Sequence, residues 1–155
     1  MMKYVAALGL LSVGFVPVSN AQDISGNANF GEVTLSSGFT PDPYVVGIVS
    51  GGNIDADSLG GSCRGRISNN PDFRLRWSAG SGSLPLIISA SSSEDTTLVI
   101  NAPDGRWYCN DDGGQGLNPS FRFNNPRGGR YEIWVGSYSG GNHSADLVIS
   151  ELTSE

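Results

Sequence analysis

Residues 95–138 read DTTLVINAPDGRWYCNDDGGQGLNPSFRFNNPRGGRYEIWVGSY. Short β-type runs alternate in this stretch with turn residues: a strand, a Pro-Asp-Gly turn, a short strand, a loop rich in Asp and Gly, a strand, a Pro/Gly turn and a final strand. Carboxylates fixed on such a frame suggest a bound cation. The stretch therefore predicts a β-rich frame and places the clearest chemistry of the chain in its acidic loop.

The run Arg130–Ser137 at the end of this stretch alternates as a β-strand does. Its two faces carry Tyr131, Ile133 and Val135 on one side, and Glu132, Trp134 and Gly136 on the other. One face is strongly apolar, so we expect it to lie on the core of the domain.

Strand-like runs also recur along the rest of the chain, with turn residues between them. The runs are Glu32–Leu35, Tyr44–Val49, Arg64–Ile67, Phe73–Trp77, Leu84–Ala90, Thr96–Ile100, Arg106–Cys109, Ser120–Phe123, Arg130–Ser137 and Ala145–Leu152. No long stretch has helical periodicity, and 22 Gly and 8 Pro interrupt the chain at short intervals. The sequence therefore predicts a single all-β domain, an antiparallel sandwich of two sheets that resembles a jelly roll.

The first residues have the pattern of a secretory signal peptide. Lys3 precedes an apolar run over Val5–Val18, and small residues then lead to Ala21, where we expect cleavage. The apolar run is too short to predict membrane insertion. Residues 1–21 are thus predicted to be a signal peptide, 22–43 an N-terminal arm or edge strand, and 44–155 the sandwich domain, exported to the periplasm or the extracellular space.

The charge balance excludes one class of partner. The only Lys lies in the expected signal peptide, so the remaining 134 residues carry 8 Arg against 15 Asp and Glu, a formal net charge of −7. Nucleic acids and anionic membrane surfaces would be repelled by this charge. The expected partner is instead an extracellular or cell-surface protein or glycan.

Two cysteines, Cys63 and Cys109, follow the expected cleavage site. An exported protein meets oxidising conditions, so a single disulfide between them is the economical interpretation. Two buried free thiols are the alternative.

The acidic loop is the candidate metal site. Asp111 and Asp112 lie in the loop, Asp95 stands before the preceding strand, and Asn118 follows the loop. Calcium takes six to eight oxygen ligands from carboxylates, amides and backbone carbonyls. Loops can supply such carbonyls, whereas the carbonyls of strands are already used in strand pairing. Adjacent carboxylates repel each other, which a bound cation would relieve. The alternative is an ordinary solvated turn, because Asp-Asp-Gly is also common turn chemistry.

These residues resemble a known family, the bacterial pre-peptidase C-terminal domain. The resemblance rests on Asp95-x-x-Leu98-x-Ile100-x-x-Pro103-Asp104-Gly105, on Asp111-Asp112-Gly113-Gly114, on Gly129-x-Tyr131-x-Ile133-x-Val135 and on Tyr138-Ser139-Gly140-Gly141. It covers about a third of the residues after the expected cleavage site. It implies a small secreted β-sandwich module, an accessory role beside exported hydrolases, and a Ca²⁺ loop.

Under this resemblance, Asp95 corresponds to the family's first strand aspartate, and Asp111 and Asp112 correspond to its Asp-Asp pair. Two positions differ from the family. Thr97 stands where the family often has a second aspartate. The family also has an acidic residue near the position of Pro119, where this chain offers only the side-chain oxygen of Asn118. These differences imply a site that is weaker or lost.

Two other clusters do not match known sites. The run from Asn53 through Asp55 and Asp57 lacks the glycine and the glutamate of an EF-hand loop, so we interpret it as a solvated turn. His143, between Asn142 and Ser144, does not form a triad with its neighbours, because triad members normally converge from distant segments. We therefore predict a non-catalytic protein, with a small secreted hydrolase or an accessory subunit of a secreted peptidase as the alternative from another class.

Aromatic residues provide one further alternative, a carbohydrate-binding module. Sugars stack on flat exposed rings, and Trp134 lies opposite the apolar face of its strand, so it is the candidate ligand-face aromatic. Packing in the core explains aromatic residues in strands equally well. The sequence leaves both interpretations open.

Overall fold

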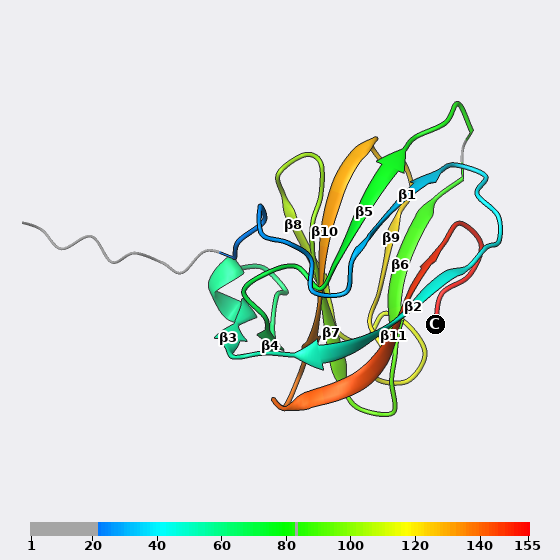
Figure 1. Ribbon diagram of the computed structural model, residues 1–155. Coiled ribbons are helices and arrows are strands. Elements are labelled where there is room, and N and C mark those ends of the chain that lie inside the picture. Colours follow the sequence, from blue (N-terminus) through cyan, green and yellow to red (C-terminus); the bar gives the residue numbers. More distant parts are fainter. Residues whose placement is uncertain (1–21, 83) are drawn as a thin grey trace, which may run out of the picture.

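The computed structural model describes residues 22–82 and 84–155. These residues form two β-sheets that face each other in one sandwich (Figure 1). The prediction of a single all-β sandwich domain is confirmed. The expected signal peptide, residues 1–21, lies outside the described part of the chain, and no helix within that part is long and apolar enough to cross a membrane.

The first sheet has seven strands and the second has four. The first contains β1 (Glu32–Ser36), β5 (Phe73–Ser78), β10 (Gly129–Ser137), β4 (Arg66–Ile67) and β3 (Ile54–Asp55), with β7 (Thr96–Asn101) also paired to β10 and β8 (Trp107–Asn110) paired to β7. The second contains β2 (Tyr44–Gly51), β11 (Asn142–Ser150), β6 (Leu86–Ser91) and β9 (Ser120–Phe123). All pairs are antiparallel except β1 with β5, which is parallel and differs from the all-antiparallel expectation.

The core lies between the two sheets. Tyr131, Ile133 and Val135 of β10 are buried there, as the alternation of the strand predicted. Leu147 and Ile149 of β11 lie opposite them in the second sheet. Burial of this apolar surface stabilises the sandwich by about 25 cal/mol per Å² removed from water.

The outer face of the first sheet is covered as well, which the alternation of β10 did not predict. The chain leaves the second sheet after β2 and forms β3, the 3₁₀ helix η1 (Ala56–Leu59) and β4. The two short strands pair with each other, and β4 joins the end of β10 in the first sheet. This excursion, residues 52–67, packs on a second hydrophobic cluster around Trp134 and Val99. Both faces of β10 are therefore buried over most of its length.

The N-terminal segment, residues 22–31, lies against the same outer face, and β1 then forms an edge of the first sheet. Two arginines of this face bind the segment: Arg74 donates to the carbonyl of Gly26 at 2.7 Å, and Arg130 to that of Ile24 at 3.0 Å. Both arginines also pair with the buried carboxylate of Glu132, each through an Nε to Oε1 contact of 2.8 Å. A charged network thus replaces apolar packing on this part of the sheet.

Asp72, just before β5, connects three segments. Its Oδ2 accepts a hydrogen bond from the backbone N–H of Val135 at 2.9 Å, and its Oδ1 lies 3.1 Å from Asn29 Nδ2 and 3.0 Å from Ser68 Oγ. Ser68 Oγ also lies 2.7 Å from the carbonyl of Asn70, although a hydroxyl has a single proton to donate. Both contacts are satisfied if Asp72 is protonated, because its O–H then donates to Ser68, and Ser68 donates to Asn70.

The pH dependence of stability tests this assignment. Burial raises the pKa of Asp72 from 3.8 to about 6, despite the hydrogen bonds that its ionised form accepts from Val135, Asn29 and Ser68, which lower the pKa. Between these two pH values the folded chain holds a proton that the unfolded chain releases, so this group lowers the free energy of unfolding as pH rises from about 4 to about 6. The shift corresponds to about 3 kcal/mol.

We expect Asp72→Asn, which mimics the neutral acid, to remove this dependence without loss of stability at pH 8. Urea unfolding of both proteins from pH 4 to pH 8 measures the difference. Parallel stability curves for the two proteins would show that the pKa of Asp72 is the same in the folded and the unfolded chain.

Candidate functional site

The three predicted aspartates are brought near one another by the pairing of β7 with β8. In this hairpin Leu98 lies opposite Asn110, so the residues that follow Asn110 return alongside the start of β7. Asp95 stands at that start. The pKa of Asp95 is raised by its burial first, and then by the negative charges of Asp112 and Asp111. The hairpin therefore concentrates negative charge at this end of the sandwich.

The contacts of these side chains do not form a complete calcium site. Asp111 Oδ2 lies 3.5 Å from Arg64 Nε, and the Asn118 side-chain oxygen already accepts from the backbone N–H of Ser92 at 3.0 Å. Asp95 Oδ1 is buried and has no hydrogen-bond partner within the described residues. Within those residues, too, no three His, Cys, Asp or Glu side chains are grouped so as to hold a metal ion. Calcium binding stays a prediction.

The shape of the acidic loop depends on Asn110, to which the sequence reasoning gave no separate role. Its side-chain oxygen accepts hydrogen bonds from the backbone N–H groups of Gly113 at 2.6 Å and Ser120 at 3.0 Å. The N–H of Gly114 donates in turn to the carbonyl of Asn118 at 2.9 Å. The loop is an ordered turn, fastened at both ends.

The prediction that Trp134 is a ligand-face aromatic is wrong. Its side chain is 0% exposed, so it cannot present a ring to a sugar. The excursion of residues 52–67 covers it, and the ring of Trp107 packs on it at a centroid distance of 5.4 Å. Trp134 is a core residue because a chain segment, rather than the second sheet, buries this face.

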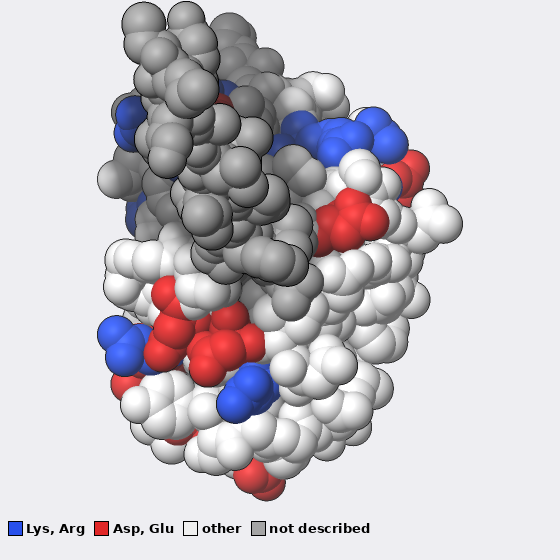
Figure 2. Space-filling model, turned by 90° about the vertical axis from the view of Figure 1, so that its left-hand side faces the viewer, with Lys and Arg blue, Asp and Glu red and all other residues white. Residues whose placement is uncertain are grey.

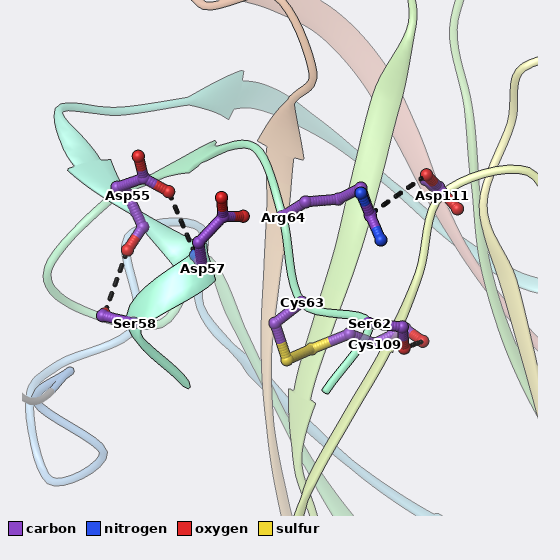
Figure 3. The surroundings of a disulfide bond; sticks show 8 residues. All are labelled: Asp55, Asp57, Ser58, Ser62, Cys63, Arg64, Cys109 and Asp111. Carbon is purple, nitrogen blue, oxygen red and sulfur yellow. Dashed lines mark hydrogen bonds and ion pairs between the residues drawn. A yellow bond between two sulfur atoms is a disulfide. The ribbon is translucent and has the colours of Figure 1, made fainter. Parts of the chain in front are cut away.

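The predicted disulfide between Cys63 and Cys109 is confirmed. It joins the segment before β4 to the end of β8, and Ser62 Oγ adds a 3.0 Å hydrogen bond to the carbonyl of Cys109 (Figure 3). The excursion is thereby fastened over Trp134. A disulfide is typical of proteins that fold in an oxidising compartment, which agrees with export.

A hollow of about 400 Å³ opens beside this disulfide, and we call it the charged hollow. Three separate segments supply its lining: β3 with η1, the chain from Arg64 into β4, and the turn between β10 and β11. Its lining residues are Asp55, Asp57, Arg64, Gly65, Arg66, Tyr138, Ser139 and Gly140. Figure 2 shows acidic side chains gathered next to basic ones on this side of the molecule.

The floor of the charged hollow has a fixed backbone. Asp55 caps η1 by accepting from the N–H of Asp57 at 3.0 Å (Figure 3). Asp55 also lies opposite Arg66 in the β3–β4 pair. Gly65 has φ +88°, and a Cβ there would lie 2.6 Å from Thr97 Oγ1. Only glycine lets the chain cross this closely over β7. Arg64 and Arg66 are thus held at defined positions on either side of it.

The wall of the charged hollow is the turn after β10. Tyr138 is 49% exposed there, while its backbone N–H donates to the carbonyl of Asp95 at 3.1 Å. Ser137 Oγ and the His143 ring both contact the carbonyl of Gly140, at 2.7 and 3.1 Å. The turn is therefore rigid, and it presents a phenol ring to solvent on a fixed backbone.

The charges of the hollow are only partly paired. Arg64 pairs with Asp111 at its edge, whereas Arg66 takes part in no ion pair within residues 22–82 and 84–155. A guanidinium carries five donors in a planar fork and suits carboxylate or carbonyl acceptors on a partner. Sequence reasoning assigned no binding role to Arg66, which belongs to no motif, or to Tyr138, which was noted only as part of the Tyr138–Gly141 motif. Only the fold brings the two residues together.

A second groove, of about 430 Å³, lies on the other side of the disulfide and is more apolar. Leu59, Trp107, Tyr108 and Phe121 line it, with Arg106 at its edge. Trp107 is half-buried, since one side of its ring packs on Trp134. We call this feature the Trp107 groove.

Comparisons with known proteins add little. No protein-family model matches the chain, and no curated protein matches it. Among solved structures, the crystal structure of PliG from Aeromonas hydrophila, a periplasmic lysozyme inhibitor of g-type lysozyme, is similar over 77% of this chain and 96% of that chain. The sequence identity is 13% and the TM-score is 0.39, a level at which we draw no functional argument.

Proposed function

We propose that this chain is an exported, non-catalytic binding module that engages a protein partner through the charged hollow. The observation that carries the proposal is the exposed ring of Tyr138 on a rigid turn beside Arg66, whose guanidinium has no ion-pair partner among the described residues. Tyr and Arg are the residue types that dominate binding energy at protein interfaces, together with Trp. Membership of the pre-peptidase C-terminal family is part of the proposal and rests on the motifs of the acidic loop and its flanking strands.

The rigidity of the hollow supports a binding role. Its three segments are fixed by the disulfide, by the cap of η1 and by the hydrogen bonds of the Gly140 turn. A preformed surface loses little conformational entropy when a partner docks, so more of the contact energy appears as affinity. Functional residues carried on loops of a rigid sandwich are a common arrangement.

The test uses the folded chain from Gln22 onward, immobilised and presented with exported bacterial proteins and with purified g-type lysozyme, the target of PliG. Tyr138→Ala and Arg66→Ala are each expected to weaken binding of the partner by about 2 kcal/mol, which is roughly 30-fold. Arg76→Ala is the matched control, because Arg76 is an exposed arginine that pairs with Glu32 on another surface. Equal loss in all three variants would contradict the proposal.

Carbohydrate binding is a second candidate, and the Trp107 groove is the observation that favours it. Its partly exposed indole next to Arg106 combines a stacking surface with a polar group. Trp107→Ala distinguishes the two candidates, since it should abolish retention of a soluble glycan and leave binding at the charged hollow unchanged. Loss of glycan retention in Tyr138→Ala alone would assign the glycan to the charged hollow instead.

Calcium stabilisation of the acidic loop is a separate proposal. Its support is the repulsion that Asp112 and Asp111 exert on Asp95, together with the buried Oδ1 of Asp95, which accepts no hydrogen bond from the described residues. We expect calcium to raise the melting temperature, and Asp112→Ala to remove this shift. Thermal unfolding in calcium and in chelator is the measurement, and coincident curves for the unsubstituted chain would end the proposal.

A further inference from the structure

The open edges of the two sheets differ in how well they are protected against pairing. An exposed strand edge offers unpaired N–H and C=O groups, and proteins usually protect it with charges, prolines or short length. In the described residues, β8 and β9 have four residues each, β3 has two, and β1 carries Glu32. The edge strand β2 has eight residues, with neither a charged side chain nor a proline. It is the least protected of these edges.

The side chains of β2 make this edge apolar as well as long. Val45 is 50% exposed and Val49 is 45% exposed, both on the outer face of the second sheet. Gly47 stands between them, and a Cβ there would meet only Asp146 Oδ1, at 3.8 Å. The strand pairs with β11 along one side, and no backbone hydrogen bond from a loop within residues 22–82 and 84–155 reaches its other side.

We propose that β2 is a self-association edge, at which two copies of this chain pair β2 with β2 in antiparallel orientation. The sequence of the strand is self-complementary about Gly47: Val45, Val46, Gly47, Ile48 and Val49. An antiparallel pair centred on Gly47 places Val45 opposite Val49 of the second copy and Val46 opposite Ile48. The pairs of Val45 with Val49 then lie on the outer face of the joined sheet, and the pairs of Val46 with Ile48 lie on its inner face, so every contact at the centre is apolar.

This arrangement joins the four-stranded sheet of one copy to that of the other as one continuous sheet. The two copies are related by a two-fold axis, the commonest symmetry of soluble homo-oligomers. A single pair of strands is a smaller contact than the interfaces of about 1,600 Å² in stable complexes. The dimer is therefore weak and reversible. Each copy carries a formal charge of −7 without the expected signal peptide, so added salt strengthens the association by screening repulsion.

Cysteine cross-linking tests the register directly. In the proposed dimer Gly47 faces Gly47 of the second copy, with Cβ positions about 5 Å apart, which a disulfide can bridge with slight adjustment. We expect Gly47→Cys to form a covalent dimer under mild oxidation. Val45→Cys alone is the matched control on the same face. It should remain monomeric, yet form dimers when mixed with chains that carry Val49→Cys.

Sedimentation velocity over a range of concentrations tests the same surface without cross-links. Val45→Lys combined with Val49→Lys places like charges opposite each other and should abolish association, whereas Val45→Lys combined with Val49→Glu should restore it. Circular dichroism and melting curves check that each variant is folded. A monomer at every concentration, association that survives the lysine pair, or Val45→Cys cross-linking as readily as Gly47→Cys would each overturn the proposal; the last would point to a different edge or partner register.

Discussion

Glu132→Ala is expected to lower the free energy of unfolding by about 3 kcal/mol, because it leaves the buried Arg74 guanidinium with only a longer contact, 3.6 Å, to the exposed Glu32. The Glu132 side chain is 2% exposed, and its two oxygens accept from Arg74 Nε at 2.8 and 2.9 Å. Arg74 itself is buried against β10 and the N-terminal segment. Denaturant unfolding measures the loss as a lower midpoint.

Arg76→Ala provides the control for this prediction. Arg76 lies two residues after Arg74 in β5, and its pair with Glu32 is exposed, so its removal should cost far less than the loss of Glu132. The double variant Glu132→Ala with Arg74→Met should recover much of the loss, since the buried one of the two guanidinium groups that pair with Glu132 is then gone, and the other, Arg130, is exposed to solvent. If Glu132→Ala costs no more than Arg76→Ala, the network does not hold the N-terminal segment.

Removal of the disulfide is expected to cost about 4 kcal/mol. Cys63 and Cys109 close a loop of 46 residues, and the chain-entropy model gives this value for such a loop. The double variant Cys63→Ala with Cys109→Ala should also loosen the excursion over Trp134, because the bond fastens that segment to β8. Urea unfolding gives the total loss, and the intrinsic fluorescence of the indoles reports the exposure of Trp134.

The chain with its disulfide reduced is the control for packing, since it keeps both sulfur atoms and lacks only the bond. The reduced chain and the alanine variant should lose similar stability. A cost below about 1 kcal/mol in both would mean that packing alone fixes the excursion. A large cost confined to the alanine variant would assign the effect to lost side-chain volume.

Most strands could be predicted from the sequence, because period-2 alternation and turn residues are local signals. Ser120–Phe123 was predicted with the bounds of β9, and the other predicted runs overlap observed strands. Within the excursion, β3 and η1 were not predicted, because contacts with Val99 and Trp134 of distant strands hold this segment in place. Because the excursion was not foreseen, Trp134 was wrongly expected on an open face. Alternation separates the two faces of a strand but does not reveal what packs on each.

The candidate site likewise combines contacts that the sequence can predict with contacts that it cannot. The approach of Asp111 and Asp112 to Asp95 follows from hairpin pairing, which sequence can suggest. The ion pair of Asp111 with Arg64, and the meeting of Arg66 with Tyr138, depend on how the excursion lies over the sheet. Such contacts between distant segments leave no periodic signal in the chain.

The binding proposal is tested most directly by calorimetric titration of one purified partner into the unsubstituted chain and into Tyr138→Ala. We expect heat of binding from the unsubstituted chain and an affinity lower by roughly 30-fold in Tyr138→Ala, with Arg76→Ala unchanged. Equal affinities for all three proteins would contradict a role of the charged hollow in binding.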